Sequence, residues 1–275
     1  MAAASAINQQ IYNASEVALH YANLAYLTPC EKVLFQTFIQ PGMSILDIGV
    51  GGGRTTPYLS AFGSRYVGID YAEEMILACR RKFPSLFFQV GNGADLSCFA
   101  DGSFDVIVMA FNSIDYVLPE AQRHRCLQEC RRVLRAGGWL IFSSHNPRSI
   151  LKKPTWNSAR VDRLAKRISG KSDLLNAWAS IALTAAASMY ALVRCLGRSA
   201  MKVARRIGTS AFWKGHGLWL DPCHGGLMTH TWTPKHCIQE VSAAGFQITK
   251  YLGDDFPGSS GQLVTDWYYY VFSKI

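Results

Sequence analysis

A run of glycines between residues 49 and 53 is the first feature of this sequence that points to ligand binding. The apolar segment Met43–Ile48 leads into Gly49, Gly51 and Gly53. Glycine lets the backbone turn tightly and approach a ligand closely, and the start of a following helix offers N–H groups to a polar ligand. A dinucleotide-binding GxGxxG loop begun at Gly49 would need Gly or Ala at position 54, where Arg54 stands. The loop therefore predicts a polar ligand, and Arg54 argues against NAD or FAD.

Two further polar segments follow the next two apolar runs. Asp70 ends the run Tyr66–Asp70, roughly 20 residues beyond the glycines, which is the offset at which a carboxylate can accept hydrogen bonds from ribose hydroxyls. The segment Gly91–Leu96 follows the third run. An acidic residue at a strand end is often only solvated, so it is the conjunction of these segments that indicates a nucleoside-containing ligand.

The order of the segments resembles the class I S-adenosylmethionine-dependent methyltransferases. The glycine run has the spacing Asp-x-Gly-x-Gly-x-Gly from Asp47, and the turns Asp101–Asp105 and Leu134–Gly138 precede the fourth and fifth apolar runs in the family's order. The resemblance covers residues 12–146 and returns at 227–274. It implies an enzyme with S-adenosyl-L-methionine as its cofactor.

The resemblance also implies cofactor-binding residues. Asp70 would hold the ribose, and Phe111, just after the fourth strand, would lie under the methionyl part. Asn92 stands where the family usually has Asp, so its carbonyl would contact the adenine amino group, with Asp95 as an alternative acceptor. Tyr21 is a candidate for the cofactor carboxylate or, alternatively, a packed helix aromatic. The other implied contacts are Asp47, Gly49, Gly51 and Gly53 on the methionine side, Arg54 at its carboxylate, Tyr71 and Met75 flanking the adenine, and Gly93 at the adenine edge.

The acceptor is expected beyond the carboxyl ends of the fourth and fifth strands, where open α/β sheets bind ligands. His145 is the best-placed general base, because an imidazole titrates near neutral pH, although it could also be a loop histidine that bonds only locally. Asn112 and Asn146 are candidates to orient the acceptor. The segment Asp221–His230 is expected to cover the pocket and to present His224 and His230 to the acceptor. A metal site built from Asp221, Cys223, His224 and His230 is not expected, because adjacent Cys and His residues are not a usual zinc spacing.

The elements that must position these residues alternate between strand and helix as far as residue 146. Such alternation predicts βαβ units, and hence an α/β fold: a Rossmann-like, seven-stranded, mostly parallel sheet with helices on both faces. Residues 151–217 show no strand pattern, so we expect a helical insertion between strands five and six. The predicted organisation is a cofactor-binding half with N-terminal helices over 1–150, a basic helical insertion that forms an acceptor lid over 151–226, and the C-terminal end of the sheet over 227–275.

The basic charge of the chain is concentrated in this insertion. Between residues 151 and 217 lie 13 of the 28 Lys and Arg but only 2 of the 19 Asp and Glu, a net charge of +11, which leaves −2 for the rest. Residues 174–193 carry no charge, but their many alanines and a polar stripe argue against a membrane span. Residues 194–207 predict a basic amphipathic helix. It would be either the solvated face of a lid or an element that contacts an anionic membrane surface, whereas nucleic acid is disfavoured because no aromatics alternate with the basic residues.

Cysteine usage and the first residues give an expectation for location. The 8 cysteines form no CxxC pair, and residues 1–10 lack a basic and apolar leader pattern. We therefore expect a cytoplasmic protein, with membrane association as the alternative. The predicted function is methyl transfer to O, N or S of a small or lipid-like acceptor. The alternatives are a lipid methyltransferase at a membrane surface, or a non-catalytic cofactor-binding scaffold.

Overall fold

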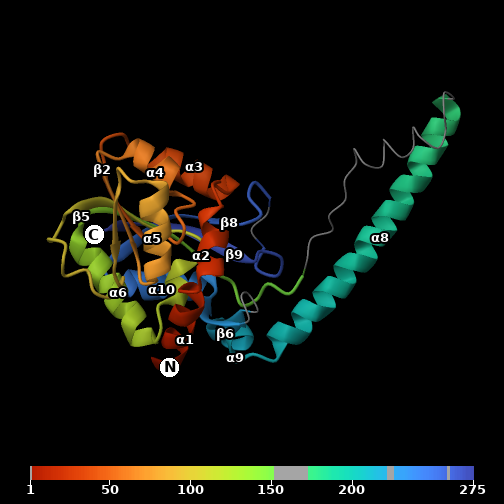
Figure 1. Cartoon of the computed structure of the whole chain (residues 1–275). Coiled ribbons are helices and arrows are strands. Elements are labelled where there is room, and N and C mark those ends of the chain that lie inside the picture. Colours follow the sequence, from red (N-terminus) through yellow and green to blue (C-terminus); the bar gives the residue numbers. More distant parts are fainter. Residues whose placement is uncertain (1, 152–172, 222–225, 259–260) are drawn as a thin grey trace. The chain divides into compact units, whose positions relative to one another are not determined.

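The computed structural model of the chain describes residues 2–151, 173–221, 226–258 and 261–275 (Figure 1). The chain forms two compact units, which we describe separately. The first, called the core unit below, contains Met1–Arg148 and Ser210–Ile275, and the second contains Ser149–Thr209. The core unit therefore resumes at Ser210, earlier than the boundary at 226 that the sequence suggested.

A seven-stranded sheet, in the order β3-β2-β1-β4-β5-β9-β8, forms the centre of the core unit. The first five strands pair in parallel, and β9 pairs antiparallel with both β5 and β8. The predicted α/β class and the mostly parallel sheet are confirmed. The strands are β1 (Ser44–Ile48), β2 (Arg65–Asp70), β3 (Phe87–Val90), β4 (Phe104–Met109), β5 (Leu134–His145), β8 (Phe246–Gly253) and β9 (Trp267–Lys274).

Helices cover both faces of this sheet, because successive strand residues point to opposite sides. Ile45 of β1 packs in the core that also contains residues of the helices between β1 and β3, whereas Leu46 packs in the core on the other side. One layer contains α3 (Pro29–Phe38), α4 (Thr56–Phe62) and α5 (Glu73–Lys82), and the other contains α6 (Glu120–Val133) and α10 (Pro234–Ala243).

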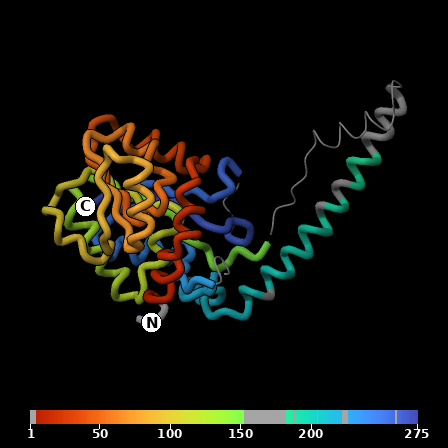
Figure 2. The backbone as a smooth tube through the Cα atoms, viewed as in Figure 1, coloured from red at the N-terminus to blue at the C-terminus, as the bar shows by residue number. Residues whose placement is uncertain are grey.

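The N-terminal helices lie at the edge of the sheet where the cofactor loop is expected. They are α1 (Ala2–Tyr12) and α2 (Ser15–Ala22). α2 packs beside α5, as the tube in Figure 2 also shows, and α1 contacts β7 (Leu227–Trp232). Segments from both ends of the chain therefore meet at this edge.

A two-stranded hairpin between α9 (Ser210–Lys214) and α10 differs from the expected loop. β6 (His216–Asp221) pairs antiparallel with β7, and the pair forms a separate small sheet. β6 contains only six residues, alternates exposed with partly buried positions and includes Gly217, so little in its own sequence specifies a strand. Its strand conformation depends on pairing with β7, which is long-range information. Two further short differences are a β5 that begins at Leu134 instead of Trp139 and a 3₁₀ turn, η1 (Ser113–Tyr116), after β4.

The second unit is dominated by one 35-residue helix, α8 (Asp173–Ile207). It joins the uncharged and the basic amphipathic segments in a single element roughly 50 Å long. Within the part of the chain that the structure describes, no helix is long and apolar enough to cross a membrane.

Candidate active site

A cavity of about 850 Å³ lies in the core unit at the carboxyl ends of β1, β2, β4 and β5. Its size is typical of sites for small molecules and cofactors. One end is formed by the glycine loop and the ends of β2 and β3, and the other by the segments after β4 and β5 together with α1, Asp221 and Trp267. We call these the donor end and the acceptor end.

Three of the glycines at the donor end serve different purposes. Gly49 and Gly51 have positive φ of 73° and 54°, a conformation that costs other residues energy. A Cβ on Gly51 would meet no protein atom within 4 Å, and Gly51 lines the cavity, so its backbone is open to a ligand. Gly52, by contrast, packs on the end of α2, where a Cβ would lie 2.2 Å from the backbone N of Ala22. The loop therefore both faces the cavity and accommodates an N-terminal helix.

Asp70 lies at the end of β2 beside this loop, as the sequence predicted. Its carboxylate accepts hydrogen bonds from the backbone N–H groups of Gly51 and Ala72, both at 2.9 Å. Burial raises the pKa of Asp70 to about 6, against the lowering effect of these backbone donors. The adjacent Tyr71 lines the cavity, and its buried hydroxyl has no hydrogen-bond partner among the described residues. This end thus offers a fixed carboxylate and an unpaired hydroxyl to a polar ligand.

Asp47 and Gly53, which the resemblance placed on the methionine side, are not among the residues that line the cavity. The Asp47 carboxylate accepts hydrogen bonds from Thr55 Oγ1 at 3.0 Å and Tyr66 Oη at 2.8 Å. Burial raises the pKa of Asp47 to about 6. A Cβ on Gly53 would lie 2.7 Å from the ring of Phe83. Both residues therefore support the glycine loop on its side away from the cavity.

Asn92 and Gly93 line the cavity beyond β3. The Asn92 carbonyl that was predicted to contact adenine accepts a hydrogen bond from the Ala94 N–H at 2.9 Å, which leaves its second lone pair and the amide NH₂ for a ligand. Asp95, the alternative acceptor, is exposed and lies outside this cavity. Met75, on α5, is buried and lines the cavity as predicted.

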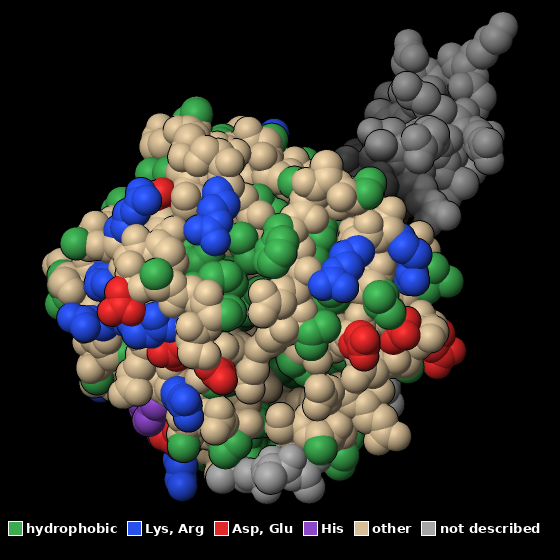
Figure 3. Space-filling model, turned by 60° about the vertical axis from the view of Figure 1, so that its left-hand side comes forward, with side chains coloured by type: hydrophobic (Ala, Val, Ile, Leu, Met, Phe, Trp, Pro, Cys, Tyr) green, Lys and Arg blue, Asp and Glu red, His purple; other side chains and the backbone are tan. Residues whose placement is uncertain are grey.

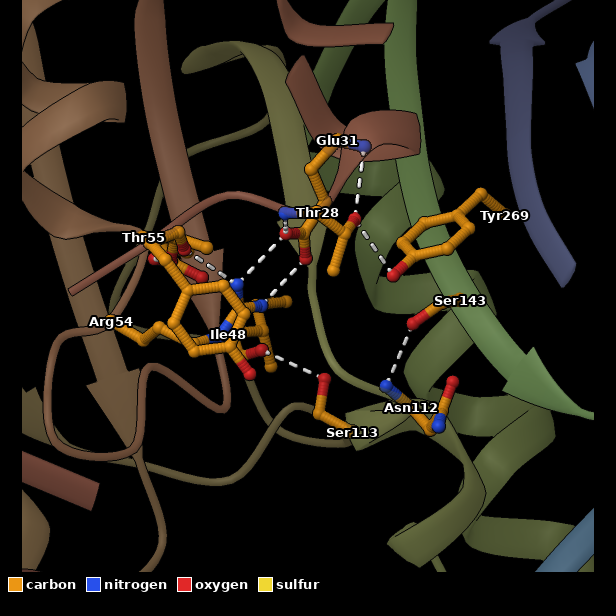
Figure 4. Close-up of polar contacts among 11 residues, drawn as sticks. Thr28, Glu31, Ile48, Arg54, Thr55, Asn112, Ser113, Ser143 and Tyr269 are labelled. Carbon is orange, nitrogen blue, oxygen red and sulfur yellow. Dashed lines mark hydrogen bonds and ion pairs between the residues drawn. The ribbon is translucent and has the colours of Figure 1, made fainter. Parts of the chain in front are cut away.

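Arg54 lines the cavity but is held by a partner that sequence analysis missed. Its guanidinium bonds both carboxylate oxygens of Glu31, at 2.6 and 2.8 Å, and the Tyr26 carbonyl at 2.8 Å (Figure 4). It also lies over the rings of Tyr26 and Phe111, 5.0 and 4.9 Å from their centroids. Its charge is therefore balanced inside the protein, and this geometry favours a structural role over binding a cofactor carboxylate. The available signal for Glu31 was its capping box with Thr28 at the start of α3.

Tyr21 of α2 does line the cavity, as one of four tyrosines from distant segments. Its ring centroid lies 6.0 Å from that of Tyr12, which in turn contacts Tyr71 at 6.2 Å and Tyr116 at 5.6 Å. Tyr21 is therefore at once a packed aromatic and a residue at the cavity, so its two predicted roles are compatible.

Phe111 and Asn112, which follow β4, are the only described non-glycine residues with positive φ, at 55° and 63°. The Asn112 N–H donates to Ser143 Oγ at 2.8 Å, which ties the end of β4 to β5 (Figure 4). The Asn112 side-chain NH₂ lies 3.2 Å from His145 Nε2, and its buried Oδ1 has no hydrogen-bond partner in the part of the chain that the structure describes. Such a strained pair persists only when surrounding structure holds it, and it often marks a functional site.

His145 at the end of β5 is oriented by Asp115 of η1. Its Nδ1 lies 2.7 Å from Asp115 Oδ2, and the same oxygen accepts the His145 backbone N–H at 2.8 Å. Ser144 Oγ donates to the other carboxylate oxygen at 2.5 Å. A carboxylate on Nδ1 fixes the proton there, so Nε2 is left as the acceptor nitrogen beside Asn112. Asp115 is fully buried and was not singled out from the sequence, although it lies only three residues beyond Asn112.

The chain is similar in sequence and in fold to known proteins. Residues 46–142 match the model of a methyltransferase domain family. These residues of the chain therefore form a methyltransferase domain. The chain is 34% identical over 104 residues (38% of the chain) to a demethylmenaquinone methyltransferase of Beutenbergia cavernae, and 30% identical over 135 residues (48%) to a fatty-acid O-methyltransferase of Mycolicibacterium smegmatis.

Both matches are partial, since they cover 41% and 47% of those two relatives. A solved S-adenosylmethionine-dependent methyltransferase from Methanosarcina mazei is similar with a TM-score of 0.56 and 21% identity, covering 90% of this chain and 98% of that one. This last likeness concerns the fold.

The donor end of the methyltransferase domain fits S-adenosylmethionine, the cofactor of the family. Asp70 presents a fixed carboxylate to a ribose, and Gly51 leaves room for close approach of the ligand to the backbone, whereas the missing Cβ of Gly49 makes room for Ser113. The unpaired Tyr71 hydroxyl and the Asn92 amide provide further polar groups on the same side.

His230 lies apart from the cavity, contrary to its predicted role beside the acceptor. It is buried on β7, with its ring centroid 4.9 Å from that of Trp232, and it is not among the lining residues. Burial lowers the pKa of His230 to about 2, and Arg123 adds to the effect. The ring is therefore neutral and part of the core, because β6–β7 pairing turns this segment inward.

Asn146 likewise does not line the cavity. Its side-chain NH₂ donates to the carbonyls of Gln262 and Thr265, so it fixes the loop before β9. Asp221 does line the cavity, and its Oδ2 lies 3.9 Å from His145 Nε2. Across the described residues there is no group of three metal-ligating side chains; Cys223 and His224 lie outside them.

Proposed function

We propose that the chain is an enzyme that transfers a methyl group from S-adenosylmethionine to a hydroxyl oxygen of a lipid-like acceptor. The observation that carries the proposal is the Asp115–His145 pair, with Nε2 of the imidazole on the cavity side. A hydroxyl must lose its proton as it attacks, and an imidazole held in one tautomer is a suited general base. A carboxylate acceptor, already ionised at neutral pH, would need no such base.

The roles of the chain's own residues follow from their positions. When bound, the cofactor supplies an electrophilic methyl group on a sulfonium. Asp70, Gly49 and Gly51 would hold it at the donor end. His145 Nε2 would take the proton of the acceptor hydroxyl, and the buried Asp115 carboxylate would stabilise the imidazolium that forms. Asn112 is a positioning residue: its amide, 3.2 Å from Nε2, would hold the ring until the acceptor hydroxyl takes its place, because that nitrogen has a single lone pair.

The walls of the acceptor end support an apolar or aromatic acceptor. Phe111, Tyr116 and Trp267 line it, together with Val117 and Leu118. Aromatic walls with few polar groups bind flat or hydrocarbon-rich molecules and leave orientation to a small number of hydrogen bonds. The names of two relatives, demethylmenaquinone and fatty-acid methyltransferases, agree with a lipid-like molecule.

Product identification tests the proposal. The purified chain would be incubated with methyl-labelled S-adenosylmethionine and a lipid extract, and the labelled products analysed by mass spectrometry. We expect a labelled methyl ether. Label on nitrogen or on a carboxyl group would overturn the acceptor assignment. Binding of S-adenosylhomocysteine with no labelled product from any extract would support a non-catalytic scaffold instead.

A further inference from the structure

The described part of α8 exposes a row of apolar side chains. Met189, Leu192, Val193 and Leu196 are 63%, 46%, 59% and 61% exposed. Their spacing of three and four residues places them on one face of a helix, and Ile207 extends that face by further turns. An apolar stripe of this kind normally packs into a core. Here the four side chains are exposed, and they occupy one side of the helix, as in an amphipathic helix.

The other face of α8 is basic and carries no balancing acid. Arg194, Arg198, Lys202 and Arg205 follow one another at helical spacing, and the sequence has no Asp or Glu between Asp173 and Asp221. Three of the four, Arg194, Arg198 and Arg205, are exposed, whereas Lys202 donates to Ser149 Oγ at 2.9 Å. On the core-unit face drawn in Figure 3, acidic side chains lie among the Lys and Arg. Beyond Asp173, α8 therefore differs from that face of the core unit, because its positive charges have no acidic side chains among them.

We propose that α8 binds the surface of an anionic lipid bilayer. The apolar stripe would enter the boundary between headgroups and acyl chains, and the arginines would contact the anionic headgroups. A second copy of the chain would cover the apolar stripe but would leave the basic face of each helix without an anionic partner. Nucleic acid would use the arginines but leave the apolar stripe in water. Among the described residues no helix is long and apolar enough to cross a membrane, and the proposal is that α8 lies along the bilayer surface.

This inference does not depend on the proposed methyl transfer. It rests on the second unit alone, and its readout is binding. If both proposals are correct, α8 brings the enzyme to the membrane in which a lipid-like acceptor is dissolved.

Vesicle flotation of the full chain tests the inference. We expect co-flotation with vesicles of phosphatidylcholine and phosphatidylserine, little with phosphatidylcholine alone, and release at high salt because exposed charges are screened. The triple variant Arg194→Gln/Arg198→Gln/Arg205→Gln should lose at least about tenfold in vesicle partitioning, and so should Val193→Asp/Leu196→Asp. The matched control Lys32→Gln/Arg81→Gln/Lys235→Gln removes the same charge from exposed sites of the core unit and should float like the parent.

Each other outcome decides against the proposal. Absence of the parent from anionic vesicles, or equal flotation of the parent and the α8 arginine variant, would overturn it. A parent that elutes as a dimer, becomes monomeric with Val193→Asp/Leu196→Asp and never floats would assign the stripe to a second copy. Circular dichroism and thermal unfolding of every variant establish that a loss is not due to misfolding.

Discussion

The two ends of the cavity are built by different means. At the donor end, backbone groups of the glycine loop and one carboxylate come from β1, β2 and the segment after β3, which are neighbours in both sequence and sheet. At the acceptor end, side chains converge from η1, β5, the β6–β7 hairpin and α1. A donor end that is formed largely by backbone groups suits a single ligand that does not vary. An acceptor end of side chains on separate elements can change its ligand without disturbing the fold.

The largest effect should come from the acceptor end, through His145. Replacement by Gln keeps a polar side chain but removes the base, so kcat should fall by about 10²- to 10⁴-fold. Calorimetry should find the affinity for S-adenosylhomocysteine unchanged. If affinity and kcat fell together, the two ends would not be functionally separate.

Asp70→Ala, at the donor end, should instead change the affinity for the cofactor. Loss of a carboxylate that accepts from two ribose hydroxyls should weaken S-adenosylhomocysteine binding by about 100-fold. Titration calorimetry on parent and variant measures this directly. An unchanged affinity would refute the assignment of Asp70 to the ribose, and a parent that fails to bind would refute the donor end as a whole.

Two adjacent glycines should separate support of the loop from contact with the ligand. Gly52→Ala puts a Cβ 2.2 Å from the Ala22 backbone N, so α2 must shift, and the free energy of unfolding should fall by about 1–3 kcal/mol. Gly51→Ala meets no protein atom within 4 Å; it should cost about 1 kcal/mol through its positive φ and act mainly on cofactor affinity. Chemical denaturation and calorimetry on both variants would reveal the contrast. A larger stability loss for Gly51→Ala than for Gly52→Ala would contradict the packing of α2 on the loop.

The smallest effect should be a pH dependence confined to the donor end. Burial raises the pKa of Asp70 from 3.8 to about 6, so from pH 7 to pH 5 a growing fraction is protonated, and cofactor affinity should fall by about tenfold. Stability of the cofactor-free chain should change with the opposite sign. A carboxyl group whose pKa is raised in the folded state stabilises the fold at low pH, and this stabilisation is lost as the pH rises from about 4 to 6. Asp47 contributes to stability in the same direction.

Calorimetry and denaturation across this pH range separate the two effects. Asp70→Asn should flatten the affinity profile and leave the contribution of Asp47 to stability. An affinity that rises toward acidic pH would show that the ionised carboxylate is not the binding form.

The sequence by itself determined the α/β class and the strands of the large sheet, and it predicted residues of which most line the donor end. The glycines and Asp70 could be identified because a βα loop and the end of the next strand are close in sequence, so spacing alone reports their geometry. His145 and Asn112 were within reach for the same reason, since the carboxyl ends of β4 and β5 meet at one edge of a parallel sheet.

Only the tertiary structure decided how the side chains around them are paired. Asp115 on His145 and Glu31 on Arg54 are contacts between elements, which no local pattern specifies. Pairing of β6 with β7 moved His230 from the expected pocket into the core. Backbone geometry is encoded within a few residues, whereas the partner of a buried charge depends on which segments the fold brings together.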